Sequence, residues 1–188
     1  MAPDMMGFIF YAGSPRFAGG LTAEAVKALP ATVKSVGVFV DAGAEEIASV
    51  AGKYALSAVQ LHGSESPGLC AQMRDRGLYV IKAVAVVREE DITATQAYEG
   101  VCDALLFDTK GVGRGGTGRK FDWDLLRAYR GTLPFILSGG IGPEDGGALA
   151  EFAHPMWAGV DLNSRFEVLP GVKDTGLLRE AIGAVRAL

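Results

Sequence analysis

The chain has 188 residues, a formal net charge of −4 at pH 7, 49% hydrophobic residues and 21% charged residues, all ordinary values for a globular protein. No run approaches the roughly 18 apolar residues that a membrane span requires, and the N-terminus lacks the pattern of a secretory signal, so we expect a cytoplasmic protein with no membrane partner. The Lys and Arg residues are scattered along the chain, which argues against a nucleic-acid partner.

Short apolar runs of strand length recur along the chain. They are rich in Val, Ile, Leu and Phe without polar alternation, as in VGVFV and ALLF, which is typical of strands buried on both faces of a parallel sheet. The predicted strands cover residues 6–11, 35–40, 58–62, 79–84, 104–108, 135–138 and 159–162.

Helix-length amphipathic segments separate these runs. Thr22, Ser66 before Pro67, and Asp122 before Trp123 have the side-chain types that cap a helix start or stand in its first turn. The predicted helices cover residues 22–29, 44–54, 66–76, 89–98, 123–129, 144–152 and 174–186.

Strict alternation of strand and helix leaves two architectures, an open doubly wound sheet and a closed eight-stranded barrel. An open sheet would favour GxGxxG after the first strand, but AGSPRF stands there and the glycine-rich loops follow the fifth, sixth and seventh strands. The pattern therefore predicts an α/β fold of the TIM (β/α)8 type, as one domain over residues 1–188. Seven βα units are visible, and because a helix ends the chain, the absent unit is expected to be the first.

Asp108 ends the aliphatic run DALLFD, which would place its carboxylate at the mouth of the barrel. Apolar neighbours there can raise the pKa of a carboxyl group, which favours acid catalysis. The alternative is a carboxylate that caps the following loop.

Two loops near the end of the chain suit a phosphate group. SGGI at residues 138–141 follows a strand and precedes GPED, which opens a helix with amide groups available. DLNSRFE at residues 161–167 offers amide, hydroxyl and guanidinium donors after the next strand. Either loop alone could be a plain turn, but the pair at the seventh and eighth barrel positions predicts a phosphate site.

The segment GVGRGGTGR at residues 111–119 has too much glycine for a helix or strand and resembles a lid, although a plain surface loop is the alternative. It is not a nucleotide-binding P-loop, because it lacks the Gly-Lys-Ser/Thr ending. The lid residues expected near the substrate are Gly115, Gly116, Thr117 and Gly118.

Further side chains at strand ends have both a binding and a structural interpretation. Arg16 in SPRF could hold a carboxylate in two hydrogen bonds or be a solvated surface residue. His62 could line the pocket or cap a turn, and His154 is expected to be structural.

Cys70 and Cys102 are expected to be buried thiols, and no grouping of ligand residues suggests a metal or another cofactor.

Taken in order, the motifs are GFIFYAGSPRF, VGVFV, AVQLHG, VIKA, LLFDT, GGTGRKFDW, ILSGGI, VDLNSRFE and PGVKD. They closely resemble phosphoribosylanthranilate isomerase of tryptophan biosynthesis over essentially the whole chain. The resemblance implies a cofactor-free Amadori rearrangement of a small phosphorylated substrate, in which an aminoaldose phosphate becomes an aminoketose phosphate.

The resemblance also implies roles for individual residues. Asp108 matches the general acid and Arg16 the residue that holds the anthranilate carboxylate. The phosphate grip corresponds to Gly139, Gly140, Asn163, Ser164 and Arg165, and further substrate contacts are expected from His62 and Asp161.

One departure from the family pattern concerns the general base. Family members begin with a strand resembling KICG, whose cysteine is the base, and no such segment precedes Met6. Cys70 is expected inside a helix and Cys102 ahead of its strand, so neither replaces it. Activity is therefore expected to be lost or to need the absent unit.

The departure has three explanations: a start codon placed too far downstream or a clipped gene, which we favour, a degenerate homologue that binds phosphate without catalysis, or a fragment completed by another polypeptide. The partner expected besides the substrate is a second copy of the chain or such a completing chain. The rival functions are a non-catalytic phosphate-binding module and another sugar-phosphate barrel isomerase or epimerase.

Overall fold

The computed structural model describes residues 2–109 and 123–188. It divides into two compact units, which are taken one at a time. The N-terminal unit comprises Ala2–Ala83 with Gly100–Asp103, and the C-terminal unit comprises Val84–Glu99 with Ala104–Leu188. The single domain expected from the sequence stays a prediction.

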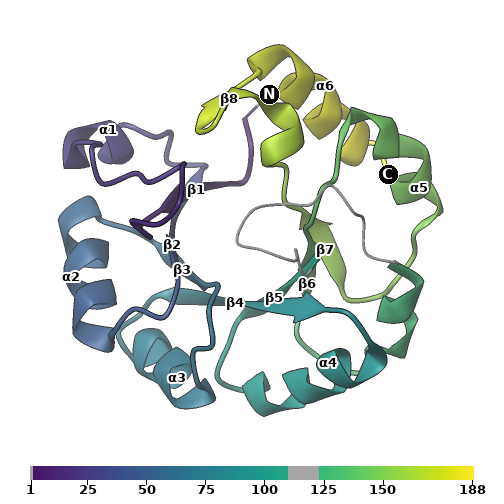
Figure 1. Cartoon of the computed structure of the whole chain (residues 1–188), viewed down its shortest axis with the longest axis horizontal. Coiled ribbons are helices and arrows are strands. Elements are labelled where there is room, and N and C mark those ends of the chain that lie inside the picture. The colour runs from purple at the N-terminus through teal and green to yellow at the C-terminus, as the bar shows by residue number, and fades with distance from the viewer. Residues whose placement is uncertain (1, 110–122) are drawn as a thin grey trace. The chain divides into compact units, whose positions relative to one another are not determined.

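The N-terminal unit contains parallel strands that pair in chain order: β1 (Met5–Ile9), β2 (Lys34–Phe39), β3 (Ala58–Leu61) and the first part of β4 (Tyr79–Val86). The helices α1 (Ala23–Lys27), α2 (Ala44–Tyr54) and α3 (Pro67–Asp75) follow β1, β2 and β3. Figure 1 shows α2 and α3 side by side along these strands. The unit therefore repeats the strand–helix alternation that the sequence predicts.

Local sequence explains these helices. The side chains of Thr22 and Ser66 accept hydrogen bonds from the amides of Ala25 and Leu69, so the predicted caps of α1 and α3 are confirmed. In α2, Ile47, Ala51 and Tyr54 are the buried residues, and their spacing places them on one face. That face packs into a core whose fully buried members include Phe39, Leu61 and Met73.

The C-terminal unit contains the parallel strands β5 (Ala104–Thr109), β6 (Phe135–Leu137) and β7 (Trp157–Val160). An antiparallel hairpin of β8 (Glu167–Leu169) and β9 (Val172–Lys173) follows. The α-helices are α4 (Glu89–Thr93), α5 (Gly146–Glu151) and α6 (Thr175–Val185). The 3₁₀ helices are η1 (Ala94–Tyr98), η2 (Trp123–Ala128), η3 (Pro143–Asp145) and η4 (Ser164–Phe166).

Aromatic rings fill much of the core of the C-terminal unit. The ring centroids of Phe107 and Phe135 lie 5.2 Å apart, and Tyr129 packs edge-on against both rings. Such edge-to-face pairs match the positive ring edge with the negative ring face. Phe107 and Phe135 stand on neighbouring strands, so the cluster fixes β5 against β6.

Several predicted elements differ from the structure. Residues 89–98 form α4 followed by the tighter η1. Residues 123–128 form the 3₁₀ helix η2, at whose end the amide of Tyr129 donates to the carbonyl oxygen of Leu126, three residues earlier, at 2.9 Å. Such i→i+3 bonds are typical of short helical segments. The segment 144–152 divides into η3 and α5. The seventh strand begins at Trp157 rather than at residue 159, and the β8–β9 hairpin was not predicted.

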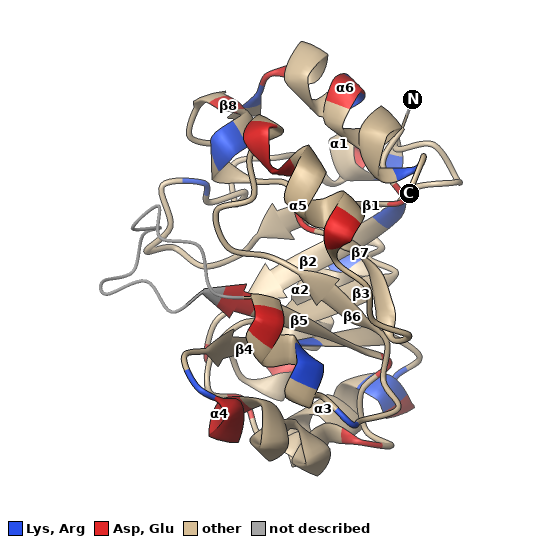
Figure 2. Ribbon diagram, turned by 90° about the vertical axis from the view of Figure 1, so that its right-hand side faces the viewer, with Lys and Arg blue, Asp and Glu red and all other residues tan. Residues whose placement is uncertain are grey.

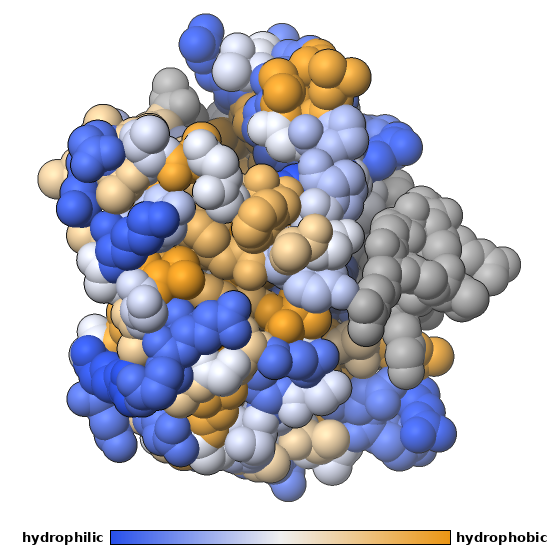
Figure 3. Space-filling view, turned by 60° about the vertical axis from the view of Figure 1, so that its left-hand side comes forward, coloured by the Kyte–Doolittle hydropathy of each residue, from blue (hydrophilic) through white to orange (hydrophobic). Residues whose placement is uncertain are grey.

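Charged residues are distributed along both units, with acidic and basic segments interspersed in the ribbon of Figure 2. Apolar side chains also reach the surface, among them Met6, Phe17 and Leu21, and Figure 3 shows apolar residues in orange between hydrophilic ones on one face. Within residues 2–109 and 123–188, no helix has the length and hydropathy needed to cross a membrane.

Candidate active site

Three polar side chains of the C-terminal unit stand at the ends of neighbouring strands: Asp108 on β5, Ser138 after β6 and Asp161 after β7. The amide of Ser138 donates to the carbonyl oxygen of Phe107 at 2.8 Å, and the amide of Asp161 donates to that of Leu137 at 2.7 Å. Ser138 Oγ also donates to Asp161 Oδ2 at 3.0 Å. The strand ends are therefore held together, as the sequence predicts for the mouth of a parallel fold.

Asp108 is half-buried at the end of an apolar strand. Leu106 and Phe107, which precede it, have exposed fractions of 1% and 0%. A carboxyl group that stands near a strand end and is partly shielded from bulk water can act as a general acid toward a bound substrate.

Gly139 and Gly140 form a tight loop after β6. Their φ angles are +92° and +73°, a region that side chains other than glycine rarely adopt. Among the described residues, none accepts a hydrogen bond from the amides of these glycines or from those of Ser164 and Arg165 after β7. Four unsatisfied amides on two adjacent loops can bind an anion.

Two donors near this loop have partners within the fold. GPED was expected to open a helix with amides available, and its first amide, that of Gly142, donates to Asp145 Oδ2 at 2.8 Å. Arg165, expected to grip phosphate, lies with its guanidinium against Glu144 Oε1 at 2.7 Å. Among the described residues of these two loops, the donors left for an anion are therefore the amides of Gly139, Gly140, Ser164 and Arg165 rather than the Arg165 guanidinium.

Asn163 begins the second loop and is held by the hairpin that follows. Lys173 Nζ donates to the carbonyl oxygen of Asn163 at 3.1 Å and also to its side-chain oxygen. The same ammonium lies 2.8 Å from Glu167 Oε1. Sequence analysis missed Lys173 and Glu167, although the motif PGVKD contains the lysine.

Arg16 and His62 belong to the N-terminal unit. Arg16 is half-buried in the loop after β1, where its amide donates to Ser14 Oγ at 3.1 Å. His62 directly follows β3, and its Nδ1 lies 2.6 Å from Gln60 Nε2. That contact with Gln60, a residue of β3, holds the His62 ring beside the end of the strand.

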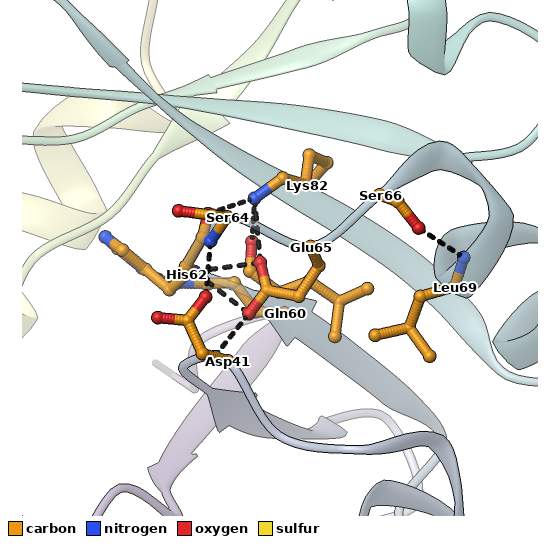
Figure 4. A network of polar contacts seen from close by, with 10 residues as sticks. Asp41, Gln60, His62, Ser64, Glu65, Ser66, Leu69 and Lys82 are labelled. Atoms are coloured by element: carbon orange, nitrogen blue, oxygen red, sulfur yellow. Dashed lines mark hydrogen bonds and ion pairs between the residues drawn. The ribbon is translucent and has the colours of Figure 1, made fainter.

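A network of polar contacts centred on Glu65 lies near His62 (Figure 4). Lys82, on β4, forms an ion pair with Glu65, in which Nζ lies 2.9 Å from Oε2. The carboxylate of Glu65 accepts hydrogen bonds from the amides of Asp41 and Gly63. Sequence analysis missed this pair, although a lysine inside the apolar run YVIKAVAV is a signal that could have revealed it, because a buried lysine needs a partner.

The remaining candidates have structural positions. Cys70, inside α3, and Cys102, ahead of β5, have exposed fractions of 0% and 2%, which confirms the prediction of buried thiols. His154 Nδ1 accepts from the amide of Met156 at 3.1 Å, in agreement with a structural role. The expected lid, Gly115 to Gly118, lies outside the described residues.

Comparison with known proteins identifies the family. The family model described as N-(5'phosphoribosyl)anthranilate (PRA) isomerase matches residues 2–184. The chain belongs to this family. It is 45% identical to the N-(5'-phosphoribosyl)anthranilate isomerase of Parabacteroides distasonis over 97% of this chain and 83% of the relative.

Solved structures agree with this assignment. The crystal structure of phosphoribosyl anthranilate isomerase from Thermotoga maritima matches with a TM-score of 0.83 and 36% identity, over 98% of this chain and 89% of the other. A complex of such an isomerase with reduced 1-(o-carboxyphenylamino)-1-deoxyribulose 5-phosphate matches with a TM-score of 0.79 and 34% identity, over 98% and 88%. The chain therefore shares the parallel α/β fold of these isomerases.

Several features expected from the sequence stay predictions. Nothing in the comparisons supports the absence of a first βα unit or a loss of activity. The homodimer, the cytoplasmic location and the individual residue roles also stay predictions. The non-catalytic binding module is not favoured, because the relatives are named as isomerases.

Proposed function

We propose that this member of the family converts N-(5-phosphoribosyl)anthranilate to 1-(2-carboxyphenylamino)-1-deoxyribulose 5-phosphate. The observation that carries the proposal is the arrangement at the ends of β5, β6 and β7. Asp108 is a half-buried carboxylate on β5, and the neighbouring strand β6 leads into the loop of Gly139 and Gly140. The amides of these glycines, and those of Ser164 and Arg165 after β7, have no acceptor among the described residues.

The reaction needs an acid first. In the proposal Asp108 donates a proton to the ribose ring oxygen, the bond from that oxygen to C1 breaks, and the anthranilate nitrogen lone pair forms the C=N bond of a Schiff base. A base then takes the proton from C2, and the resulting enolamine tautomerises to the ketone. The base releases the C2 proton to solvent, and Asp108 takes up a proton from solvent, so both groups return to their starting states and no proton is gained or lost.

The substrate phosphate binds the loop amides. A phosphate dianion accepts hydrogen bonds from the amides of Gly139, Gly140, Ser164 and Arg165, while Asp161 hydrogen-bonds a sugar hydroxyl group. Anchoring the phosphate at one end orients the sugar carbons toward Asp108, which lowers the entropy cost of reaching the reactive geometry. Arg16 binds the anthranilate carboxylate in two parallel hydrogen bonds, and His62 contacts the substrate.

The base is the part of the mechanism that the chain's cysteines do not supply. Both thiols are buried in the core of the N-terminal unit. A thiol without access to the substrate carbon cannot take its proton. The base therefore comes either from another residue of this chain or from a strand–helix unit ahead of Met1, and activity measurements on two forms of the protein distinguish these sources.

The test measures isomerase activity on N-(5-phosphoribosyl)anthranilate with this chain and with a form that carries a first strand–helix unit of the family ahead of Met1. The Asp108→Asn variant of the active form should lose about 10² to 10⁴ in kcat. The matched control is Asp124→Asn, because Asp124 is an exposed residue of η2 that pairs with Arg127.

The outcomes separate the possibilities. Activity in this chain alone would assign the base to its own residues, whereas activity only in the extended form would assign it to the added unit. Inactivity of both forms, or full activity of Asp108→Asn, would refute the proposal.

A further inference from the structure

Lys173 has its hydrogen-bonding capacity filled by two residues. Its ammonium group carries three protons, and the structure gives it three acceptors: the backbone oxygen of Asn163, the side-chain oxygen of Asn163, and Glu167 Oε1. An ammonium with three protein acceptors has no proton left for a ligand. Lys173 therefore acts on the fold around it rather than by direct contact with an anion.

Glu167 holds the lysine in place. Its side chain is only 4% exposed, and it stands directly opposite Lys173 in the register of the β8–β9 hairpin. The amide of Gly171 donates to the same carboxylate at 3.0 Å, so the turn of the hairpin is attached to the ion pair. A buried carboxylate with these partners fixes the lysine in one position.

The contact with Asn163 fixes the start of the proposed phosphate loop. Asn163 is bound through both its backbone and its side chain, so neither can rotate freely while Lys173 is in place. The carbonyl oxygen of Asn163 also accepts from the amide of Phe166 at 3.1 Å, which closes the 3₁₀ turn η4. Between these two residues lie Ser164 and Arg165, whose amides have no acceptor among the described residues.

We propose that Lys173, held by Glu167, is a positioning residue that aims the amides of Ser164 and Arg165 at the substrate phosphate. The inference rests on the proposed function, since it takes these amides as part of the phosphate site. It extends that function by giving the β8–β9 hairpin a role, because the hairpin brings the lysine back to the loop.

The test uses the Lys173→Met variant, which keeps the length and the apolar stem of the side chain but removes the ammonium. The dissociation constant of inorganic phosphate, measured by calorimetric titration, should rise about tenfold. That change is equivalent to the loss of one hydrogen bond from a displaced loop amide to the charged phosphate. In the active form of the enzyme, KM should rise by a similar factor while kcat changes by less than about threefold, because the interaction concerns substrate binding.

A control variant and a second test variant complete the experiment. Lys53→Met removes an exposed lysine that packs over the ring of Tyr54 in the N-terminal unit, and it should leave phosphate affinity unchanged. Glu167→Gln keeps an acceptor for Lys173 and should give an intermediate loss of phosphate affinity with a smaller effect on folding. Thermal unfolding of each variant identifies any that fail to fold. If Lys173→Met does not fold, the phosphate affinity of Glu167→Gln decides whether the positioning role holds.

The outcomes are distinct from those for the isomerase activity. Weaker phosphate binding by folded Lys173→Met supports the positioning role even if the protein lacks isomerase activity. Unchanged phosphate affinity in Lys173→Met and Glu167→Gln, or a fall in kcat at unchanged KM, would overturn it. Absence of phosphate binding by the unmodified protein would overturn both this inference and the proposed phosphate site.

Discussion

Lys82 and Glu65 form a buried ion pair in which Nζ lies 2.9 Å from Oε2 and the side chains are 3% and 1% exposed. Lys82 Nζ also donates to the carbonyl oxygens of Leu61 and Gly63, at 3.0 and 2.7 Å. Glu65 in turn accepts from the amides of Gly63 and Asp41. The pair therefore links the chain segments that follow β2 and β3 to the interior of β4 (Figure 4).

Removal of one charge from this pair should be strongly destabilising. In Lys82→Met the carboxylate of Glu65 stays buried without its cation, and we expect the free energy of unfolding to fall by about 3 to 5 kcal/mol. Urea denaturation followed by circular dichroism measures the change. The matched control is Arg76→Met, which breaks the exposed ion pair with Glu45 and should have little effect. Equal losses in both variants would contradict the interpretation.

A second set of variants separates charge from packing. The double variant Lys82→Met with Glu65→Gln removes both charges and keeps an amide oxygen for the backbone donors of the loops. We expect it to be more stable than Lys82→Met alone, because no unpaired charge remains in the interior. A double variant that is no more stable than the single one would show that packing, not charge, dominates.

Tyr129 makes stability depend on alkaline pH. Burial, followed by the nearby carboxylate of Glu99, raises the pKa of Tyr129 from 10.0 to about 12. The folded protein thus holds the phenol proton more tightly than the unfolded chain does. The resulting stabilisation is fully present below pH 10 and is lost as the pH rises toward 12, and it corresponds to roughly 2 to 3 kcal/mol.

The Tyr129→Phe variant tests this dependence. It should cost about 1 kcal/mol at neutral pH, because the hydroxyl group donates to the Leu133 carbonyl oxygen at 3.0 Å. Between pH 10 and pH 12 the variant should lose less unfolding free energy than the unmodified protein. Parallel pH curves for the two proteins would be evidence against the role assigned to Tyr129.

The cysteines should react slowly and contribute little to activity. The hydrogen bond with the thiol of Cys70, followed by burial, raises the pKa of Cys102, and both side chains are buried. Since the thiolate is the reactive species, we expect labelling by a thiol reagent only after unfolding. In the active form of the enzyme, Cys70→Ala and Cys102→Ala should each keep kcat within about threefold, because neither thiol touches substrate in the proposed mechanism. Loss of activity in either variant, with the fold intact, would identify a base that the mechanism lacks.

The strands and the rim residues could be predicted because each depends on local sequence. Continuous apolar runs such as VGVFV determine a buried parallel strand, and the residue that ends a run must stand at its end, as Asp108 and His62 do. Both units show this agreement between pattern and structure.

The supporting contacts could not be predicted from local sequence. Lys82 is 17 residues from Glu65, and Lys173 is 10 residues from Asn163. Only the parallel register of β3 with β4, and the return of the β8–β9 hairpin, bring these groups together. The short 3₁₀ helices were also missed, since a segment of one or two turns has too few positions for its period to be recognised.

Gly140 provides the sharpest test of the phosphate loop, because a second glycine has the same backbone requirement. Gly140 and Gly77 have φ angles of +73° and +83°, and an added Cβ would meet nothing within 4 Å at either position. Alanine at each should therefore cost about 1 to 2 kcal/mol of stability through backbone strain alone. Only Gly140→Ala should also weaken inorganic phosphate binding, since the strain shifts an amide of the proposed site. Gly77, at the end of α3, has no part in that site. Equal phosphate affinities in the two variants, measured by calorimetric titration, would remove the Gly140 amide from the phosphate site.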